Sequence, residues 1–239
     1  MTTQTLDYRH GDTLSRGYLA RPDASGPRPG IVIFHEAPGL NDNVKRRANM
    51  LAELGFVALG ADLYGGGVVA KDGDEAMRLM GALREDTALL RARARAALDA
   101  LAAQPNVDRG RLAATGYCFG GFTALELARS GAPLAGVVSF HGLLGTQKPA
   151  SAGAIKARIL ACTGAADPLA PADQVVAFER EMTEAGVDWQ VITYGGAKHA
   201  FTNPAADALG RPGFGYQAEA DRRSWAAMRA FFGEIFGAA

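Results

Sequence analysis

The feature that most constrains this chain is a cysteine framed by glycines, placed between an apolar run and a helix-like stretch. The pentapeptide GYCFG runs from Gly116 to Gly120, after the apolar run at 111–115 and before the stretch at 122–128. Glycine two residues before and two after a central side chain removes bulk where a sharp turn from strand into helix would clash. The pattern predicts an elbow that holds the Cys118 thiol in a strained backbone conformation, exposed above a sheet.

The same segment also fits a buried cysteine beside helix-packing glycines, because 30 of the 239 residues are glycine. Two residues further along the chain favour the elbow. Asp167 follows an apolar strand at 158–163, and His199 follows another at 189–193. Loops at the carboxyl ends of parallel strands are where such sheets assemble their sites. The order nucleophile, acid, histidine is that of α/β-hydrolases.

These three residue types complete one another chemically. A free cysteine thiol, with a pKa of ~8.5, is mostly protonated at neutral pH, so a nearby imidazole is needed to take its proton and later return it to a leaving group. A carboxylate holds the imidazole in the useful tautomer. Asp167 taken alone fits a turn carboxylate equally well. Together the residues predict Cys118 as nucleophile and His199 as base, with the backbone N–H of Phe119 facing a developing oxyanion.

The other histidines need separate interpretations. His141 follows the apolar strand at 135–140 and is the rival base; its alternative is a strand-end histidine bonded to backbone. His10 fits an exposed turn between short strands, and His35 adjoins Glu36 after the strand at 31–34.

Five segments, in order along most of the chain, resemble the dienelactone hydrolase family, also called carboxymethylenebutenolidases. They are HEAPGLN at 35–41, ADLY at 61–64, GYCFGG at 116–121, GAAD at 164–167 and GAKHAF at 196–201. The resemblance implies a single α/β-hydrolase domain over residues 1–239, with Cys118, His199 and Asp167 as a catalytic triad. It also implies that Glu36 contacts the thiol and helps form the thiolate, and that the Ala37 N–H is the second oxyanion donor.

The chemistry of Glu36 leaves two interpretations open. A carboxylate beside a thiol disfavours the thiolate by like-charge repulsion, so Glu36 would keep Cys118 neutral at rest or take its proton during binding. Alternatively, Glu36 is a loop carboxylate paired with one of three nearby cations, Lys45, Arg46 or Arg47.

The chain departs from the resemblance where substrate charge is concerned. Family members that hydrolyse dienelactone hold its carboxylate with arginines that follow the D-L-Y segment and the catalytic histidine. Here 65–68 reads GGGV and 200–204 reads AFTNP, and the sequence does not place Arg78, Arg84 or Arg211 at the site. Without a guanidinium fork, affinity for an anionic lactone should fall. We therefore expect a neutral, partly apolar pocket lined by Phe34, Tyr64, His141, Phe201 and Tyr216.

The predicted function is hydrolysis of small neutral carboxylic esters or lactones through a covalent thioester on Cys118. Three alternatives stay open: a dienelactone hydrolase acting on an anionic lactone, a promiscuous aryl esterase or phosphotriesterase, and a binding protein without catalysis. A phosphotriester is included because its developing phosphoryl charge makes a similar demand on an oxyanion hole.

Composition predicts a cytoplasmic enzyme without nucleic-acid or membrane partners. The 25 basic and 25 acidic residues balance, and the run Arg91–Arg95 fits a solvated helix face. No stretch has membrane-span length, and the polar start lacks a signal-peptide core. Two cysteines without Cys-x-x-Cys pairs give no sign of a metal site or cofactor. We expect a monomer or a homodimer.

Alternating strands and helices predict an α/β fold with a mostly parallel, doubly wound sheet and helices on both faces. Strands are expected at 3–8, 14–20, 31–34, 56–61, 112–117, 135–140, 158–163 and 189–194. Helices are expected at 46–54, 86–103, 122–128, 172–185 and 219–236.

Overall fold

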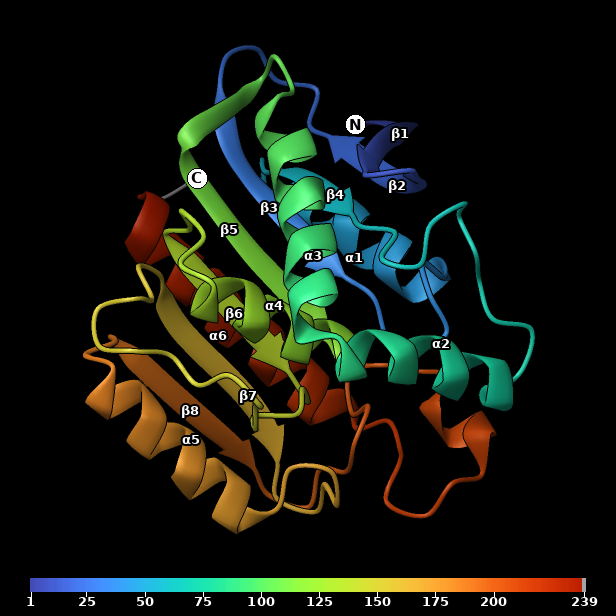
Figure 1. Cartoon of the computed structure of the whole chain (residues 1–239), viewed down its shortest axis with the longest axis vertical. Coiled ribbons are helices and arrows are strands. Elements are labelled where there is room, and N and C mark those ends of the chain that lie inside the picture. Colours follow the sequence, from blue (N-terminus) through green and yellow to red (C-terminus); the bar gives the residue numbers. More distant parts are fainter. Residues whose placement is uncertain (238–239) are drawn as a thin grey trace.

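A computed structural model describes residues 1–237, and its eight strands form one sheet in the order β1-β2-β4-β3-β5-β6-β7-β8 (Figure 1). The strands are β1 (Thr2–His10), β2 (Thr13–Arg21), β3 (Arg28–Phe34), β4 (Val57–Gly60), β5 (Val107–Tyr117), β6 (Gly136–Phe140), β7 (Arg158–Gly164) and β8 (Trp189–Tyr194). The helices are α1 (Asp42–Glu53), α2 (Gly73–Glu85), α3 (Thr87–Ala102), α4 (Phe119–Arg129), α5 (Ala172–Glu184), the 3₁₀ turn η1 (Ala206–Leu209) and α6 (Ala218–Phe236).

Strands β3 to β8 pair in parallel, whereas β1 and β2 form an antiparallel hairpin that joins the sheet through β4. All six parallel strands therefore end at the same edge of the sheet. The predicted fold class, a mostly parallel sheet with helices on both faces, is confirmed.

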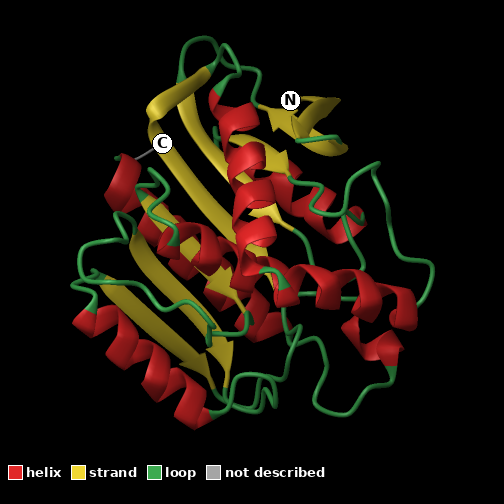
Figure 2. Cartoon of the chain, viewed as in Figure 1, coloured by secondary structure: helices red, strands yellow, loops and turns green. Residues whose placement is uncertain are grey.

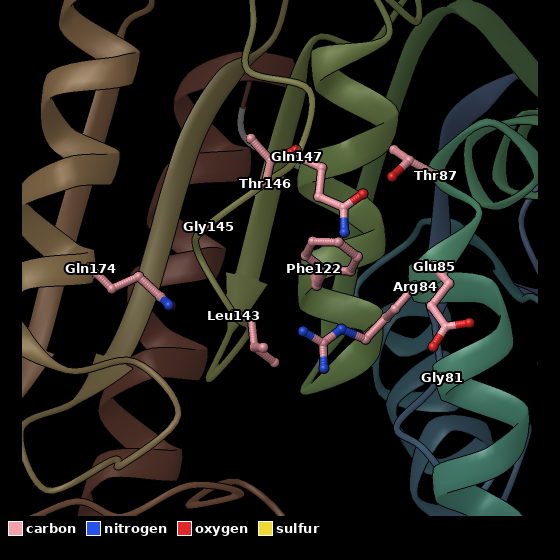
Figure 3. A pocket seen from close by; sticks show the side chains of 10 residues that line it. All are labelled: Gly81, Arg84, Glu85, Thr87, Phe122, Leu143, Gly145, Thr146, Gln147 and Gln174. Atoms are coloured by element: carbon pink, nitrogen blue, oxygen red, sulfur yellow. The ribbon is translucent and has the colours of Figure 1, made fainter.

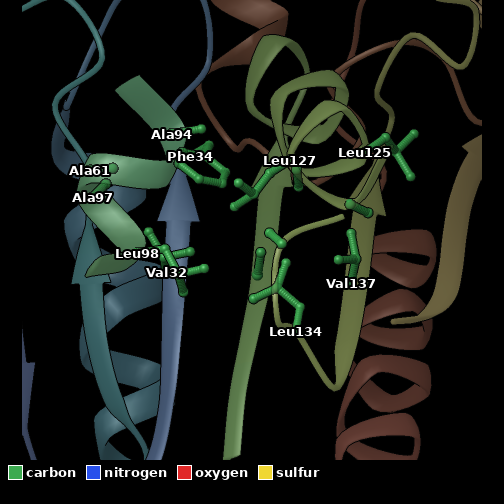
Figure 4. Close-up of a cluster of buried hydrophobic side chains, with 14 of the residues drawn as sticks. Val32, Phe34, Ala61, Ala94, Ala97, Leu98, Leu125, Leu127, Leu134 and Val137 are labelled. Carbon is green, nitrogen blue, oxygen red and sulfur yellow. The ribbon is translucent and has the colours of Figure 1, made fainter. Parts of the chain in front are cut away.

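Helices cover both faces of the sheet (Figure 2), and an apolar cluster lies on each face. On one face α2, α3, α4 and α5 cover a cluster that includes Val32, Leu98 and Leu127 (Figure 4). On the other face α1 and α6 cover a second cluster, which includes Ile31 and Phe232. Central strands buried on both sides explain the continuous apolar runs in the sequence.

Helix α2 was absent from the predicted elements. Its buried side chains, those of Ala76, Met80 and Leu83, have the i, i+4, i+7 spacing of a helix face, so the sequence carries a signal that the prediction missed. The start of α2 also carries a capping signal, because Asp72 accepts a hydrogen bond from the Glu75 N–H and the Glu75 carboxylate accepts one from the Lys71 N–H.

The glycines of the elbow are required by close backbone approach. A Cβ atom on Gly116 would lie 2.0 Å from the Gly120 carbonyl oxygen, and one on Gly120 would lie 1.9 Å from the Phe34 carbonyl oxygen. No side chain fits at such distances, so these two residues let α4 start directly against the ends of β3 and β5.

The Arg91–Arg95 run is not the solvated face that its sequence predicts. Arg91 pairs with the buried Glu126 carboxylate of α4, and Arg93 donates to the carbonyl oxygens of Leu63 and Tyr64. These arginines therefore tie α3 to α4 and to the loop after β4. Arg95 alone lies in an exposed pair, with Asp99.

Candidate active site

Cys118 forms the turn between β5 and α4, with φ of 55° and ψ of −116°. A non-glycine residue rarely adopts positive φ, and the crowding around the turn holds it there. The side chain is partly exposed at the carboxyl edge of the sheet. This geometry matches the predicted elbow.

The loops after β7 and β8 bring an acid and an imidazole to the thiol. The Nε2 atom of His199 lies 3.0 Å from the Cys118 Sγ, and its Nδ1 lies 2.9 Å from Oδ2 of Asp167. The other Asp167 oxygen, Oδ1, accepts the Leu169 N–H at 2.8 Å. The three residues predicted to act together are thus in hydrogen-bond contact, in the predicted order.

The surroundings of His199 favour its charged form. Burial alone would lower the pKa of this imidazole, but the charge of Cys118 and the hydrogen bonds with Asp167 and Cys118 outweigh it, so the pKa is raised above 6.5. A thiolate beside an imidazolium is the arrangement that makes a cysteine strongly nucleophilic.

Residues 211–215, which the sequence prediction did not place at the site, hold His199 in position. The His199 N–H donates to the Gly213 carbonyl, and the His199 carbonyl accepts from the Gly215 N–H. Between them, the Phe214 ring packs edge-on against the imidazole with centroids 4.7 Å apart, and the Arg211 guanidinium covers Phe214.

His141 is near the site but does not contact the thiol as a base. It is fully buried, its Nδ1 accepts the Cys118 N–H at 3.1 Å, and its Nε2 lies 2.8 Å from Thr202 Oγ1. Burial, together with the neighbouring His199 and Arg47, lowers its pKa well below 6.5. The rival base is therefore a neutral histidine bonded to backbone, as its alternative interpretation predicts.

The two expected oxyanion donors are free to receive a ligand. Within residues 1–237, the N–H groups of Ala37 and Phe119 donate to no other group of the protein. The Ala37 carbonyl accepts the Tyr64 hydroxyl at 2.7 Å, and the Tyr64 ring is stacked on Phe119. The fully buried His35 joins the same loops, since its Nδ1 bonds the Glu36 carbonyl and its Nε2 accepts the Leu63 N–H.

Glu36 has contacts that differ from both sequence interpretations. Its carboxylate, 5% exposed, accepts hydrogen bonds from the side-chain amides of Asn43 and Asn203 at 3.0–3.1 Å. In the described part of the chain it forms no ion pair, because Arg47 pairs with Asp221. In this conformation the thiol faces His199, and Glu36 connects the loops that flank it.

Several expected pocket residues lie beneath the site rather than around it. Phe34 and Phe201 are completely buried in the two apolar clusters, so both belong to the core, as His141 also does. The Tyr216 hydroxyl points to Asp221, near the start of α6. Tyr64 and Tyr216 are partly exposed, and Tyr64 contacts the oxyanion loop, the loop that carries Ala37.

A cavity of about 440 Å³ lies at the same edge of the sheet (Figure 3). Its floor includes Phe122, whose N–H bonds the Cys118 carbonyl one helical turn from the thiol. The Arg84 guanidinium and the Gln174 amide face this floor from opposite sides, and Leu143 lies between them. Arg84 and Glu85 of α2, the helix missing from the prediction, both line this cavity, whereas the three triad residues are not among its lining residues.

Residues 1–237 contain neither a candidate metal site nor a candidate membrane span. Among residues 1–237, no group of three His, Cys, Asp or Glu side chains is arranged to hold a metal ion. No helix in that range combines the length and apolarity that a membrane span needs.

A strand, elbow and helix at the centre of a parallel sheet, with an acid and a histidine on later loops, define the α/β-hydrolase class. The chain matches the model of the dienelactone hydrolase family over residues 15–236, and it belongs to this family. It is a hydrolase of the dienelactone hydrolase type.

Three similar proteins illustrate the range of the family. A dienelactone hydrolase-like promiscuous phosphotriesterase, P91, from metagenomic libraries is 47% identical, with a TM-score of 0.94 over 99% of both chains. A Bradyrhizobium protein named as a probable 2-oxo-3-(5-oxofuran-2-ylidene)propanoate lactonase is 31% identical over 87% of this chain and 89% of its own. A dienelactone hydrolase from Anabaena variabilis shares the fold, with a TM-score of 0.69 at 22% identity over 95% of this chain and 97% of its own.

Proposed function

We propose that this protein hydrolyses small carboxylic esters or lactones through a covalent thioester on Cys118. The observation that carries the proposal is the 3.0 Å contact between the Cys118 Sγ and the His199 Nε2, with Asp167 behind the imidazole. A thiol held this way, beside two unoccupied N–H donors, has the parts that acyl transfer needs.

In the first half of the reaction, the Cys118 sulfur forms a bond to the carbonyl carbon of the substrate. The carbonyl oxygen becomes an oxyanion, which accepts hydrogen bonds from the N–H groups of Phe119 and Ala37. The bond to the leaving oxygen then breaks, and the His199 imidazolium gives its Nε2 proton to that oxygen. An alcohol and a thioester result; for a lactone, both remain in one molecule.

Water completes the reaction. His199, now neutral, takes a proton from a water molecule that attacks the thioester carbonyl, while the same N–H groups hold the second oxyanion. The carbon–sulfur bond breaks to release a carboxylic acid. The thiolate and imidazolium are restored.

We further propose that the substituent remote from the scissile carbonyl extends into the cavity of about 440 Å³ over Phe122 and Leu143. This volume suits small-molecule ligands. Glu36 flanks the thiol without an ion-pair partner among residues 1–237, and its negative charge favours substrates whose reacting end is neutral. Arg84 at the cavity wall supplies the contact that an anionic lactone, the alternative substrate, would use.

Aryl phosphotriesters are the second candidate substrates. The 47% identical relative P91 is described as a promiscuous phosphotriesterase. The same thiolate would form a sulfur–phosphorus bond as the phenol leaves, and the phosphoryl oxygen would occupy the oxyanion position.

The test is a panel holding a neutral aryl ester, a neutral lactone, an anionic dienelactone and an aryl phosphotriester, assayed with wild type and Cys118→Ala. We expect turnover of the neutral ester and lactone that vanishes with Cys118→Ala. Activity that survives this substitution would show that Cys118 is not the nucleophile. Binding without hydrolysis in wild type would instead support a non-catalytic protein.

A further inference from the structure

The distance between the thiol and its imidazole partner is set by two segments far apart in the chain. Cys118 and His199 are 81 residues apart, one on the β5–α4 elbow and the other on the loop after β8. The 3.0 Å contact between their side chains is one hydrogen bond at a partly exposed position. Contacts beneath it must fix the two backbones relative to each other.

A buried histidine joins these two segments directly. His141 follows β6, which lies between β5 and β7 in the sheet. The Cys118 N–H is shared between the Phe140 carbonyl, at 3.0 Å, and Nδ1 of His141, at 3.1 Å. Nε2 of His141 lies 2.8 Å from Oγ1 of Thr202, three residues after His199. Both His141 and Thr202 are completely buried.

We propose that this connection, which we name the His141–Thr202 bridge, positions Cys118 relative to His199. The inference rests on the proposed function of that pair. His141 and Thr202 are positioning residues in this account, because neither touches the thiol or a substrate. No sequence motif marks Thr202, and the resemblance gave His141 no role.

The bonding pattern fixes the protonation state that the bridge requires. Because the Cys118 N–H is a donor, Nδ1 of His141 must be an unprotonated acceptor, and the ring proton is on Nε2, where it is donated to Thr202. A charged imidazole would lose the bond to Cys118. It would also place a second positive charge beside His199, whose ring centroid is 5.3 Å away.

The surrounding structure holds both ends of the bridge rigid. His141 has φ of 39°, a strained value for a non-glycine residue, and its N–H donates to the Cys162 carbonyl of β7. At the other end, the Thr202 carbonyl accepts a hydrogen bond from the buried Arg47 guanidinium at 2.7 Å. Arg47 is itself paired with Asp221 of α6.

The test compares Thr202→Val with Thr202→Ser. Valine keeps the shape of threonine and the backbone contact with Arg47 but removes the hydroxyl, whereas serine keeps the hydroxyl. We expect Thr202→Val to lower kcat for a neutral aryl ester roughly tenfold with little change in KM, and Thr202→Ser to retain most of the activity. Equal effects of the two substitutions would overturn the proposal, because the loss of activity would then not depend on the presence of the hydroxyl.

A second measurement does not depend on turnover. The rate of alkylation of Cys118 by iodoacetamide should fall in Thr202→Val and in His141→Leu, with Thr202→Val adding nothing in the His141→Leu background. Independent, additive effects would overturn the bridge. If hydrolysis of the panel substrates is absent in wild type or survives in Cys118→Ala, while alkylation follows this pattern, the proposed function is wrong and the bridge is still supported.

Discussion

Glu36 is the residue whose contacts in the structure differ most from the sequence interpretations. The resemblance predicts contact with the thiol, yet the carboxylate is bound by the amides of Asn43 and Asn203. Sequence alone cannot reveal this, because Asn203 is 167 residues from Glu36 and neither asparagine carries a motif. The two amide donors make Glu36 an acceptor that joins the start of α1 to the loop after His199.

We therefore predict that Glu36→Gln leaves the pH–rate profile unchanged. A glutamine side chain keeps one acceptor oxygen, but its NH₂ group would face the NH₂ group of Asn43 or Asn203. The free energy of unfolding should therefore fall by about 1–3 kcal/mol. Parallel pH–rate and urea-denaturation measurements check this prediction. A shift of the profile, or faster alkylation of Cys118 in the variant, would show that the carboxylate does act on the thiol.

At the scale of elements, the loop after β4 is organised by one buried carboxylate. Asp62 accepts the N–H groups of Arg16, Tyr64, Gly65 and Gly67. The glycine run at 65–67 is thus a hydrogen-bonded turn, and it holds Tyr64 against the oxyanion loop.

Asp62→Asn should destabilise the protein by about 2 kcal/mol or more, because an amide nitrogen would face N–H donors at a buried position. Activity should fall as well, since Tyr64 loses its support. Urea denaturation measures the first effect. Asp99→Asn, in the exposed pair with Arg95, is the control and should change stability by under about 0.5 kcal/mol; an equal loss in both variants would contradict the account.

Helix α2 gives a matched pair of arginines. Arg84 lines the cavity near Cys118, whereas Arg78 pairs with Glu75 outside it. Arg84→Gln should lower kcat/KM for an aryl half-ester with a distal carboxylate roughly two- to fivefold relative to its neutral isostere, as expected for an exposed charge pair. Arg78→Gln should leave the ratio of kcat/KM for these two substrates unchanged. If Arg84→Gln also leaves the ratio unchanged, the substituent does not lie in this cavity.

The elements that sequence predicted correctly are those with strong local signals. The elbow glycines, the apolar strands and the loops carrying Asp167 and His199 each follow from a short pattern. Arg84 was not placed because α2 was overlooked, although its buried side chains have helical spacing. Phe214 was not placed because no local pattern marks its contact with His199. Phe34 and Phe201 were misassigned because an aromatic residue next to a catalytic segment fits core and pocket equally well; Phe34 ends β3, and Phe201 follows His199 by two residues.

Over the whole molecule, buried neutral histidines should make stability fall in acid. Burial lowers the pKa of His35 to about 4, and that of His141 falls well below 6.5. Below about pH 6.5 the unfolded chain takes up these protons and the folded protein does not, so each site costs about 1.4 kcal/mol per pH unit until its folded pKa is reached. His199 adds little slope below pH 6.5, because its raised pKa keeps it protonated in the folded protein and its ordinary pKa protonates it in the unfolded chain.

Urea denaturation between pH 7 and pH 4 checks this slope. His35→Asn should be less stable at pH 7, but its free energy of unfolding should depend less steeply on pH, by the slope that corresponds to about one proton. His10→Asn, at the partly exposed end of β1, should follow wild type. Parallel curves for all three proteins would contradict the assignment of His35.

The most direct test of the central claim is mass spectrometry of the protein quenched in acid during turnover of a neutral aryl ester. The account predicts that the acyl group is recovered as a thioester on the peptide that contains Cys118, and that it is lost on further incubation at neutral pH. An acyl group recovered on another residue, or turnover without any covalent adduct on Cys118 in a rapid-quench time course, would contradict it.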